Sequence, residues 1–111
     1  MNALDLSFIN AQQMHKENPE SFYAPDETEL ENIALNDFVK IGVRIFDKEC
    51  SCDCERFWLE VIRIEDGVIH ARVDNQLVFT EYHNVACHDE LIVSPHHVMN
   101  ILLGERHECA N

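Results

Sequence analysis

The chain is short and strongly acidic, and these properties exclude several classes of protein. Its 111 residues include 8 Lys and Arg against 21 Asp and Glu, a formal net charge of −13. This length fits one domain, and an apolar share of 46% predicts a folded core. Nucleic acids and anionic membranes are bound by clustered Lys and Arg, which this chain lacks. We therefore expect neither a nucleic-acid partner nor a membrane partner.

The acidity itself leaves two interpretations open. It can serve to keep a small domain in solution, or it can attract a basic partner protein and speed the encounter by electrostatic steering. The sequence does not specify an oligomeric state. Both interpretations are carried forward to the structure.

The N-terminus and the cysteines bear on location. The opening residues, MNALDLSFINAQQ, contain no basic residue and no continuous apolar stretch, so we expect no secretory signal here. No run approaches the roughly 20 apolar residues of a membrane-spanning helix. The five cysteines are an odd number, which argues against a secreted disulfide framework. We expect reduced thiols and a cytoplasmic protein.

The first 35 residues are predicted to form a helical extension. Apolar residues recur at helical spacing in Leu4, Phe8, Ala11 and Met14. This pattern predicts a short helix within residues 1–20, which ends at Pro19. A second short helix is expected to begin at Asp26, with Asp26 as its N-cap and Glu29 as the reciprocal partner of a capping box.

Alternating apolar residues from residue 36 onward predict a small antiparallel sheet. The expected strands are Phe38–Phe46, Arg56–Ile64, Val68–Asp74, Gln76–Thr80 and Glu90–Val93. About five strands of this length form a bent sheet or a partly open barrel, similar in size to an SH3 domain. The fold class is therefore α+β.

The C-terminal part is predicted to be helical. Ser94-Pro95 is typical of an N-cap followed by a first-turn proline. An apolar helix face is then expected from Val98, Met99, Ile101 and Leu102, with Gly104 as the stop. Residues 36–103 would form the sheet core with this helix, and 104–111 a tail, all within a single domain, 1–111.

The register of the central hairpin can be predicted from the cost of burying a charge. A two-residue Asp66-Gly67 turn would place Glu60 opposite Val73 in an apolar layer, where its carboxylate has no partner. A three-residue turn that includes Glu65 places Glu60 opposite Arg72 and Ile62 opposite His70. We therefore predict the three-residue turn, with Gly67 in the left-handed conformation and a cross-strand Glu60–Arg72 ion pair.

This register assigns the apolar residues of the hairpin to two faces. Phe57, Leu59 and Val61 share one face with Ile69, Ala71 and Val73. The other face carries Trp58, Ile62, Ile64 and Val68, so both sides of the sheet need a cover. We expect the sheet to curl over one core while the N-terminal helix covers part of the other face.

A short pattern occurs twice in the sequence. Asn36-Asp37-Phe38-Val39-Lys40-Ile41 and His88-Asp89-Glu90-Leu91-Ile92-Val93 both lead from a turn with Asp directly into a strand. The two segments are therefore expected to start strands in the same way.

The central residues resemble a known family. The strand Glu55-Arg56-Phe57-Trp58-Leu59-Glu60-Val61 is followed by Asp66-Gly67, Arg72-Val73-Asp74-Asn75 and Asp89-Glu90. This pattern resembles the small bacterial domains grouped as domain of unknown function 2314, over roughly residues 36 to 101. The resemblance implies a fold and a bacterial setting but no catalytic residues. The sequence departs from the pattern at Asn36 and His88, where a turn glycine is usual, and in the Cys50–Cys54 insert.

The sharpest candidate for chemistry is the cluster of Cys50, Cys52 and Cys54. Three thiolates on one loop can bind a soft metal such as zinc. The set of ligands would be completed from His83, Cys87, His88, His107 or Cys109. Structural zinc sites usually use paired CxxC motifs, whereas CxCxC does not let the sulfurs converge in that way. A loop that carries thiols without metal is the simpler interpretation.

Three classes of function are compatible with these features. The first is a non-catalytic binding or interaction module that meets a basic partner through a sheet edge or the face of Trp58, where Glu60, Arg72 and His70 are also expected. The second is a metal- or thiol-dependent regulator that uses the Cys50–Cys54 loop. An enzyme ranks last because no nucleophile, base and orienting group can be recognised together.

Overall fold

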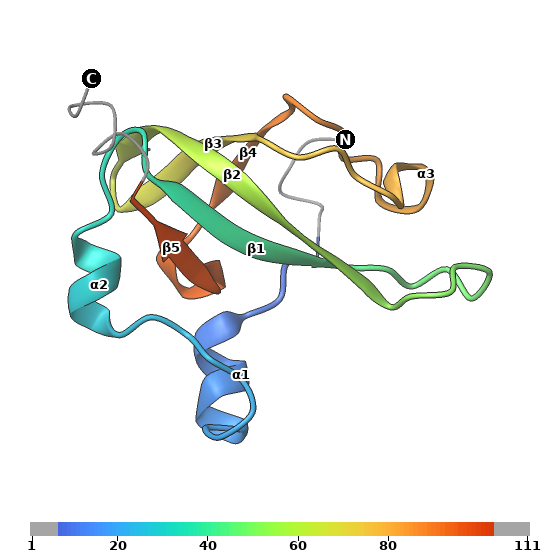
Figure 1. Ribbon diagram of the computed structural model, residues 1–111, viewed down its shortest axis with the longest axis horizontal. Coiled ribbons are helices and arrows are strands. Elements are labelled where there is room, and N and C mark those ends of the chain that lie inside the picture. The colour runs from blue at the N-terminus through green and yellow to red at the C-terminus, as the bar shows by residue number, and fades with distance from the viewer. Residues whose placement is uncertain (1–6, 104–111) are drawn as a thin grey trace.

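A five-stranded antiparallel sheet forms the centre of the protein in the computed structural model, which describes residues 7–103 (Figure 1). The strands are β1 (Phe38–Arg44), β2 (Cys54–Glu65), β3 (Val68–Val73), β4 (Glu90–Val93) and β5 (Asn100–Leu102). They lie in the order β4-β3-β2-β1-β5, so the sheet is open and does not close into a barrel. The short helices are α1 (Ala11–Glu17), α2 (Glu27–Glu31), α3 (Thr80–His83) and the 3-10 helix η2 (Pro95–His97). The α+β class and the antiparallel sheet are confirmed.

The core lies on the sheet face that the hairpin pattern predicts. Its central side chains are Phe57, Leu59, Val61, Ile69, Ala71 and Val73, each at most 2% exposed. From β1, Val39, Ile41 and Val43 join the same layer. Trp58 and Glu60 alternate with these residues and are only half-buried on the opposite face. The predicted division into two faces is therefore confirmed from Phe57 to Val61, but it is wrong for Ile64, which lies opposite the core residue Ile69.

The turn of the central hairpin differs from the prediction. Glu65 pairs with Val68, so the turn has two residues, Asp66 and Gly67, with φ values of 55° and 76°. These positive angles suit the favoured two-residue hairpin turns. The predicted three-residue turn is therefore wrong.

A bulge nevertheless restores the predicted pairing of charged residues. The register shifts between Val61 and Arg63, so that Arg63 lies opposite His70 while Glu60 still lies opposite Arg72. The extra residue, Ile62, has no partner, and the predicted pairing of Ile62 with His70 is wrong. An inserted residue changes the register by one and moves every later side chain to the other face. The bulge thus keeps Glu60 out of the core without a longer turn.

The repeated Asp pattern forms the same turn at both outer strands. Before β1, Ala34 N–H donates to the Asp37 carboxylate (3.0 Å) and Asp37 N–H donates to the Ala34 carbonyl (3.1 Å). Before β4, Ala86 and Asp89 make the same two bonds at 2.9 and 3.1 Å. The preceding residue is left-handed in both copies: φ is 73° at Asn36 and 76° at His88.

The N-terminal segment covers part of the second sheet face, as expected. The helix is shorter than predicted, because Phe8 forms an isolated bridge with Val43 and α1 begins only at Ala11. Ile9 and Met99 lie against Gly42 so closely that an added Cβ would be 2.7 Å from Ile9 Cδ1. A glycine is therefore needed at this position for close packing. The predicted helical position Leu4 lies outside the described residues.

The second helix begins as the sequence predicts. Asp26 accepts a hydrogen bond from Glu29 N–H (2.8 Å), and the Glu29 carboxylate accepts one from Asp26 N–H (2.9 Å). This reciprocal pair is the predicted capping box. Within residues 7–103, no helix is long and apolar enough to span a bilayer.

Two predicted elements near the C-terminus are wrong. Residues 76–79 form no strand, and α3 begins at Thr80. The predicted C-terminal helix is limited to η2, after which the chain becomes strand β5, paired with β1. Val98 and Ile101 are apolar at a spacing that suits a helix, but the open edge of β1 offers backbone pairing that the helix cannot use. Gly104 and the tail lie outside the described residues.

Candidate functional site

The four residues predicted to bind a partner lie on one face of the sheet. Trp58 lies opposite Lys40, and Glu60 lies opposite both Phe38 and Arg72. His70 is two residues from Arg72 on β3 and lies opposite Ile92. We call this surface the Trp58 face and define it by Phe38, Lys40, Trp58, Glu60, His70, Arg72, Glu90, Ile92 and Leu102.

Trp58 is held firmly by its backbone. Its N–H donates to Asn75 Oδ1 (2.6 Å), and its carbonyl accepts from Asp74 N–H (2.9 Å). The indole ring is half-buried, and Lys40 Nζ lies 5.9 Å from its centroid. An ammonium group at this distance is attracted by the ring face. The backbone of Trp58 is thus anchored at both its N–H and its carbonyl, and a cation lies beside its amphipathic side chain.

The predicted ion pair between Glu60 and Arg72 is not formed. The two residues lie opposite each other, yet their side chains make no ion pair among the described residues. His70 is engaged instead, because its Nδ1 lies 3.2 Å from Arg63 Nη2 and its Nε2 lies 4.0 Å from Glu65 Oε1. The carboxylate of Glu60 and the guanidinium of Arg72, at the centre of the Trp58 face, are therefore available to a partner.

The Trp58 face also exposes apolar side chains at its two edges. Leu102 on β5 is 56% exposed, and Ile92 on β4 is 38% exposed. Leu102 continues the row through Phe38, Glu60, Arg72 and Glu90 that crosses all five strands. The row thus has two apolar residues at its β5 end, followed by three charged residues.

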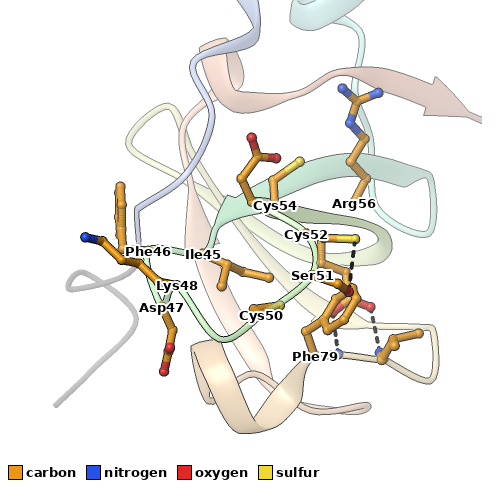
Figure 2. Close-up of a pocket in the computed structure, with 13 residues that line it drawn as sticks. Ile45, Phe46, Asp47, Lys48, Cys50, Ser51, Cys52, Cys54, Arg56 and Phe79 are labelled. Carbon is orange, nitrogen blue, oxygen red and sulfur yellow. Dashed lines mark hydrogen bonds between the residues drawn. The ribbon is translucent and has the colours of Figure 1, made fainter.

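The three clustered cysteines do not belong to the Trp58 face. They line a pocket beside the loop that joins β1 to β2 (Figure 2). The pocket has a volume of about 890 Å³ and lies between the loop of residues 45–54 and residues 78–79. Phe46 and Val78 on its walls are each 76% exposed. Cys50, Cys52 and Cys54 are spread along this loop, as Figure 2 shows.

The cysteine loop assembles no metal site in the part of the chain that the structure describes. There, no group of three or more His, Cys, Asp or Glu side chains is placed to hold a metal ion. Cys50, Cys52, Cys54 and Cys87 are free thiols. His107 and Cys109, two of the predicted additional ligands, lie outside the described residues. The loop therefore gives the predicted zinc set no geometric support.

One of the residues that line this pocket, Glu55, carries a largely buried carboxylate. Glu55 accepts hydrogen bonds from Val78 N–H (2.7 Å), Phe79 N–H (2.9 Å) and His83 Nε2 (2.8 Å). Burial by itself raises the pKa of the Glu55 carboxyl, but the hydrogen bonds from Val78, His83 and Phe79 outweigh that effect, so the pKa lies below its ordinary value. Glu55 thereby ties the segment before α3 to the start of β2.

His83, another proposed metal ligand, has no nitrogen left for one. Its Nδ1 accepts from Val85 N–H (3.1 Å), so the ring proton is on Nε2 and is donated to Glu55. The side chain is 2% exposed. Sequence reasoning missed this pair because 28 residues separate the partners and neither lies in a recognisable motif.

A second histidine with a shifted pKa is also structural. Burial, with a smaller contribution from neighbouring His96, lowers the pKa of His97 to about 4. His97 is therefore neutral near pH 7, and its Nδ1 accepts from Ser94 N–H (3.1 Å) at the start of η2. The group stabilises a turn, and no nucleophile bonds to it among the described residues.

The comparisons with known proteins add no relative. No protein-family model, no curated protein and no solved structure matches the chain. Its resemblance to the bacterial domains therefore stays a prediction from the residues alone.

Proposed function

We propose that this chain is a non-catalytic interaction module that binds a basic protein through the Trp58 face. The proposal includes the cytoplasmic setting expected from the sequence. It is supported by the gathering of Trp58, Glu60, Arg72 and His70 on one side of the sheet, opposite the core. Surfaces that bind proteins commonly use tryptophan and arginine beside apolar side chains.

The observation that carries the proposal is the row across the five strands. It presents Leu102, Phe38, Glu60, Arg72 and Glu90 in order, with charged groups that have no partner in the described structure. A partner can bury the apolar end and pair with the carboxylates of Glu60 and Glu90. The net charge of −13 favours a basic partner over an acidic one and speeds its approach at low salt.

The proposal predicts that a lysine at Leu102 strongly weakens partner binding. Leu102→Lys removes an exposed apolar contact and adds a cation that repels a basic protein. Its matched control is Phe46→Lys, which makes the same change at a residue that is also exposed but lies on the pocket wall. The measurement is quantitative affinity capture from a lysate of the encoding organism, with purified folded variants as bait.

We expect basic proteins captured by the wild type to be retained by Phe46→Lys and reduced about tenfold or more by Leu102→Lys. Trp58→Ala should cause a similar loss once its circular dichroism spectrum has established that it is folded. Equal capture by the two lysine variants would contradict the proposed surface. Capture of acidic proteins would contradict the proposed partner.

A further inference from the structure

A separate apolar groove lies between α2 and the tip of the β2–β3 hairpin. Its volume is about 370 Å³, at the lower end of the range for sites that take a small ligand or a side chain. The groove and the cysteine loop lie at opposite ends of the molecule, since Figure 1 shows α2 far from the loop after β1. The groove thus shares no residue with the Trp58 face or with the pocket of Figure 2.

The floor of the groove is a partly open part of the core. Ile33 and Ile69 are buried members of the main apolar cluster, and Leu30 packs against that cluster. Ile64 lies beside them opposite Ile69, and it is 41% exposed. An apolar group from outside would therefore find an apolar surface already in place and bury Ile64 further.

The charges at the rim all have one sign. Glu27 and Glu31 line the groove, and no Lys or Arg lines it. Neither carboxylate makes a hydrogen bond or an ion pair among the described residues, whereas Glu29 on the same helix is occupied by the capping box and Tyr23. The nearby turn adds Asp66. A cation beside the groove would therefore meet carboxylates that have no internal partner.

We propose that this groove binds a basic segment of a partner protein through one inserted apolar side chain flanked by Lys or Arg. The apolar side chain covers Leu30, Ile33, Ile64 and Ile69, and the flanking cations pair with Glu27 and Glu31. The inference goes beyond the proposed function, since it uses other residues and does not depend on the Trp58 face.

The probe for this site is a pair of short peptides that differ at one position. Acetyl-Lys-Lys-Leu-Lys-Lys-amide carries the apolar residue, and the matched peptide has Ser in place of Leu. Each is titrated into the ¹⁵N-labelled full chain at low salt while amide chemical shifts are recorded. We expect the leucine peptide to shift amides of residues 27–33 and 64–69 and to bind about fivefold or more tightly than the serine peptide.

Two double variants of equal net charge test the role of the rim carboxylates. Glu27→Gln/Glu31→Gln removes both rim carboxylates, and Glu20→Gln/Glu49→Gln removes two exposed carboxylates elsewhere. We expect the rim variant to weaken binding of the leucine peptide about two- to tenfold relative to the control variant. Binding should also weaken as salt rises.

Each other outcome would overturn the inference. If the chain binds the leucine and serine peptides equally tightly, the attraction is due to charge alone. If the two double variants bind the leucine peptide equally tightly, Glu27 and Glu31 are not part of the site. Chemical-shift changes confined to the Trp58 face would show that the peptide binds there and not in the groove. That result would contradict the groove without contradicting the proposed function. No binding of either peptide would also contradict the groove, without bearing on the Trp58 face.

Discussion

Replacing Glu55 with Gln is expected to lower the free energy of unfolding by about 2–3 kcal/mol. The carboxylate accepts three hydrogen bonds, from Val78 N–H, Phe79 N–H and His83. Glutamine has one acceptor oxygen, and its amide N–H groups would face donors that cannot accept. Chemical denaturation monitored by Trp58 fluorescence measures the change. Glu60→Gln is the matched control on the same strand and should change stability by less than about 0.5 kcal/mol.

The effect of Glu55 should depend on pH in a defined direction. Its pKa in the folded protein is lowered below the ordinary value of 4.5. A carboxyl with a depressed pKa contributes stability that is present above its unfolded pKa and is lost as the pH falls through the folded pKa. The difference in unfolding free energy between wild type and Glu55→Gln should therefore be largest near pH 7 and should decrease below about pH 4.5. A difference that grows on acidification would contradict the assigned hydrogen bonds.

Replacing Asp37 with Ala is expected to lower the free energy of unfolding by about 2–3 kcal/mol, as for Glu55→Gln. Its side chain is fully buried and accepts from Ala34 N–H, and alanine would remove this acceptor together with the buried atoms of the carboxylate. Asp89 makes the same bond to Ala86 N–H in the second copy of the turn but is exposed. Because water can replace the lost acceptor there, Asp89→Ala should cost only about 1 kcal/mol.

Thermal unfolding of the two alanine variants side by side measures this contrast. The two turns share the same backbone hydrogen bonds and differ in the surroundings of the carboxylate, so the comparison measures what the buried surroundings of Asp37 contribute. Equal losses of stability for Asp37→Ala and Asp89→Ala would mean that burial of the carboxylate does not govern its contribution.

The sequence predicted the faces of the central hairpin correctly from Phe57 to Val61, and it was wrong about the turn and about the face of Ile64. The strong alternation from Phe57 to Val61 determines which side chains are buried, because each buried position alternates with a polar or amphipathic one. Asp66-Gly67 favours a two-residue turn, whereas Glu60 requires the register of a longer one. The structure satisfies both through the unpaired residue Ile62. No local propensity marks the position of such a bulge.

The other differences have long-range causes. Residues 98–102 have apolar spacing compatible with a helix, but β5 forms because the edge of β1 is open to it. The Glu55–His83 bond and the groove beside α2 join segments far apart in the sequence. The Trp58 face could be predicted because strand alternation alone assigns Trp58 and Glu60 to one side. Whether Glu60 pairs with Arg72 depends on side-chain conformation, which alternation does not determine.

The proposed binding surface depends on the placement of Trp58, Glu60 and Arg72 on the side of the sheet opposite the core. The most direct test is a set of backbone nuclear Overhauser effects across the central hairpin in solution. We expect cross-strand effects between Glu60 and Arg72 and, beyond the bulge, between Arg63 and His70. A cross-strand effect between Glu60 and Val73 would instead indicate a register in which the Glu60 and Trp58 side chains point into the apolar layer. That result would contradict the proposed surface.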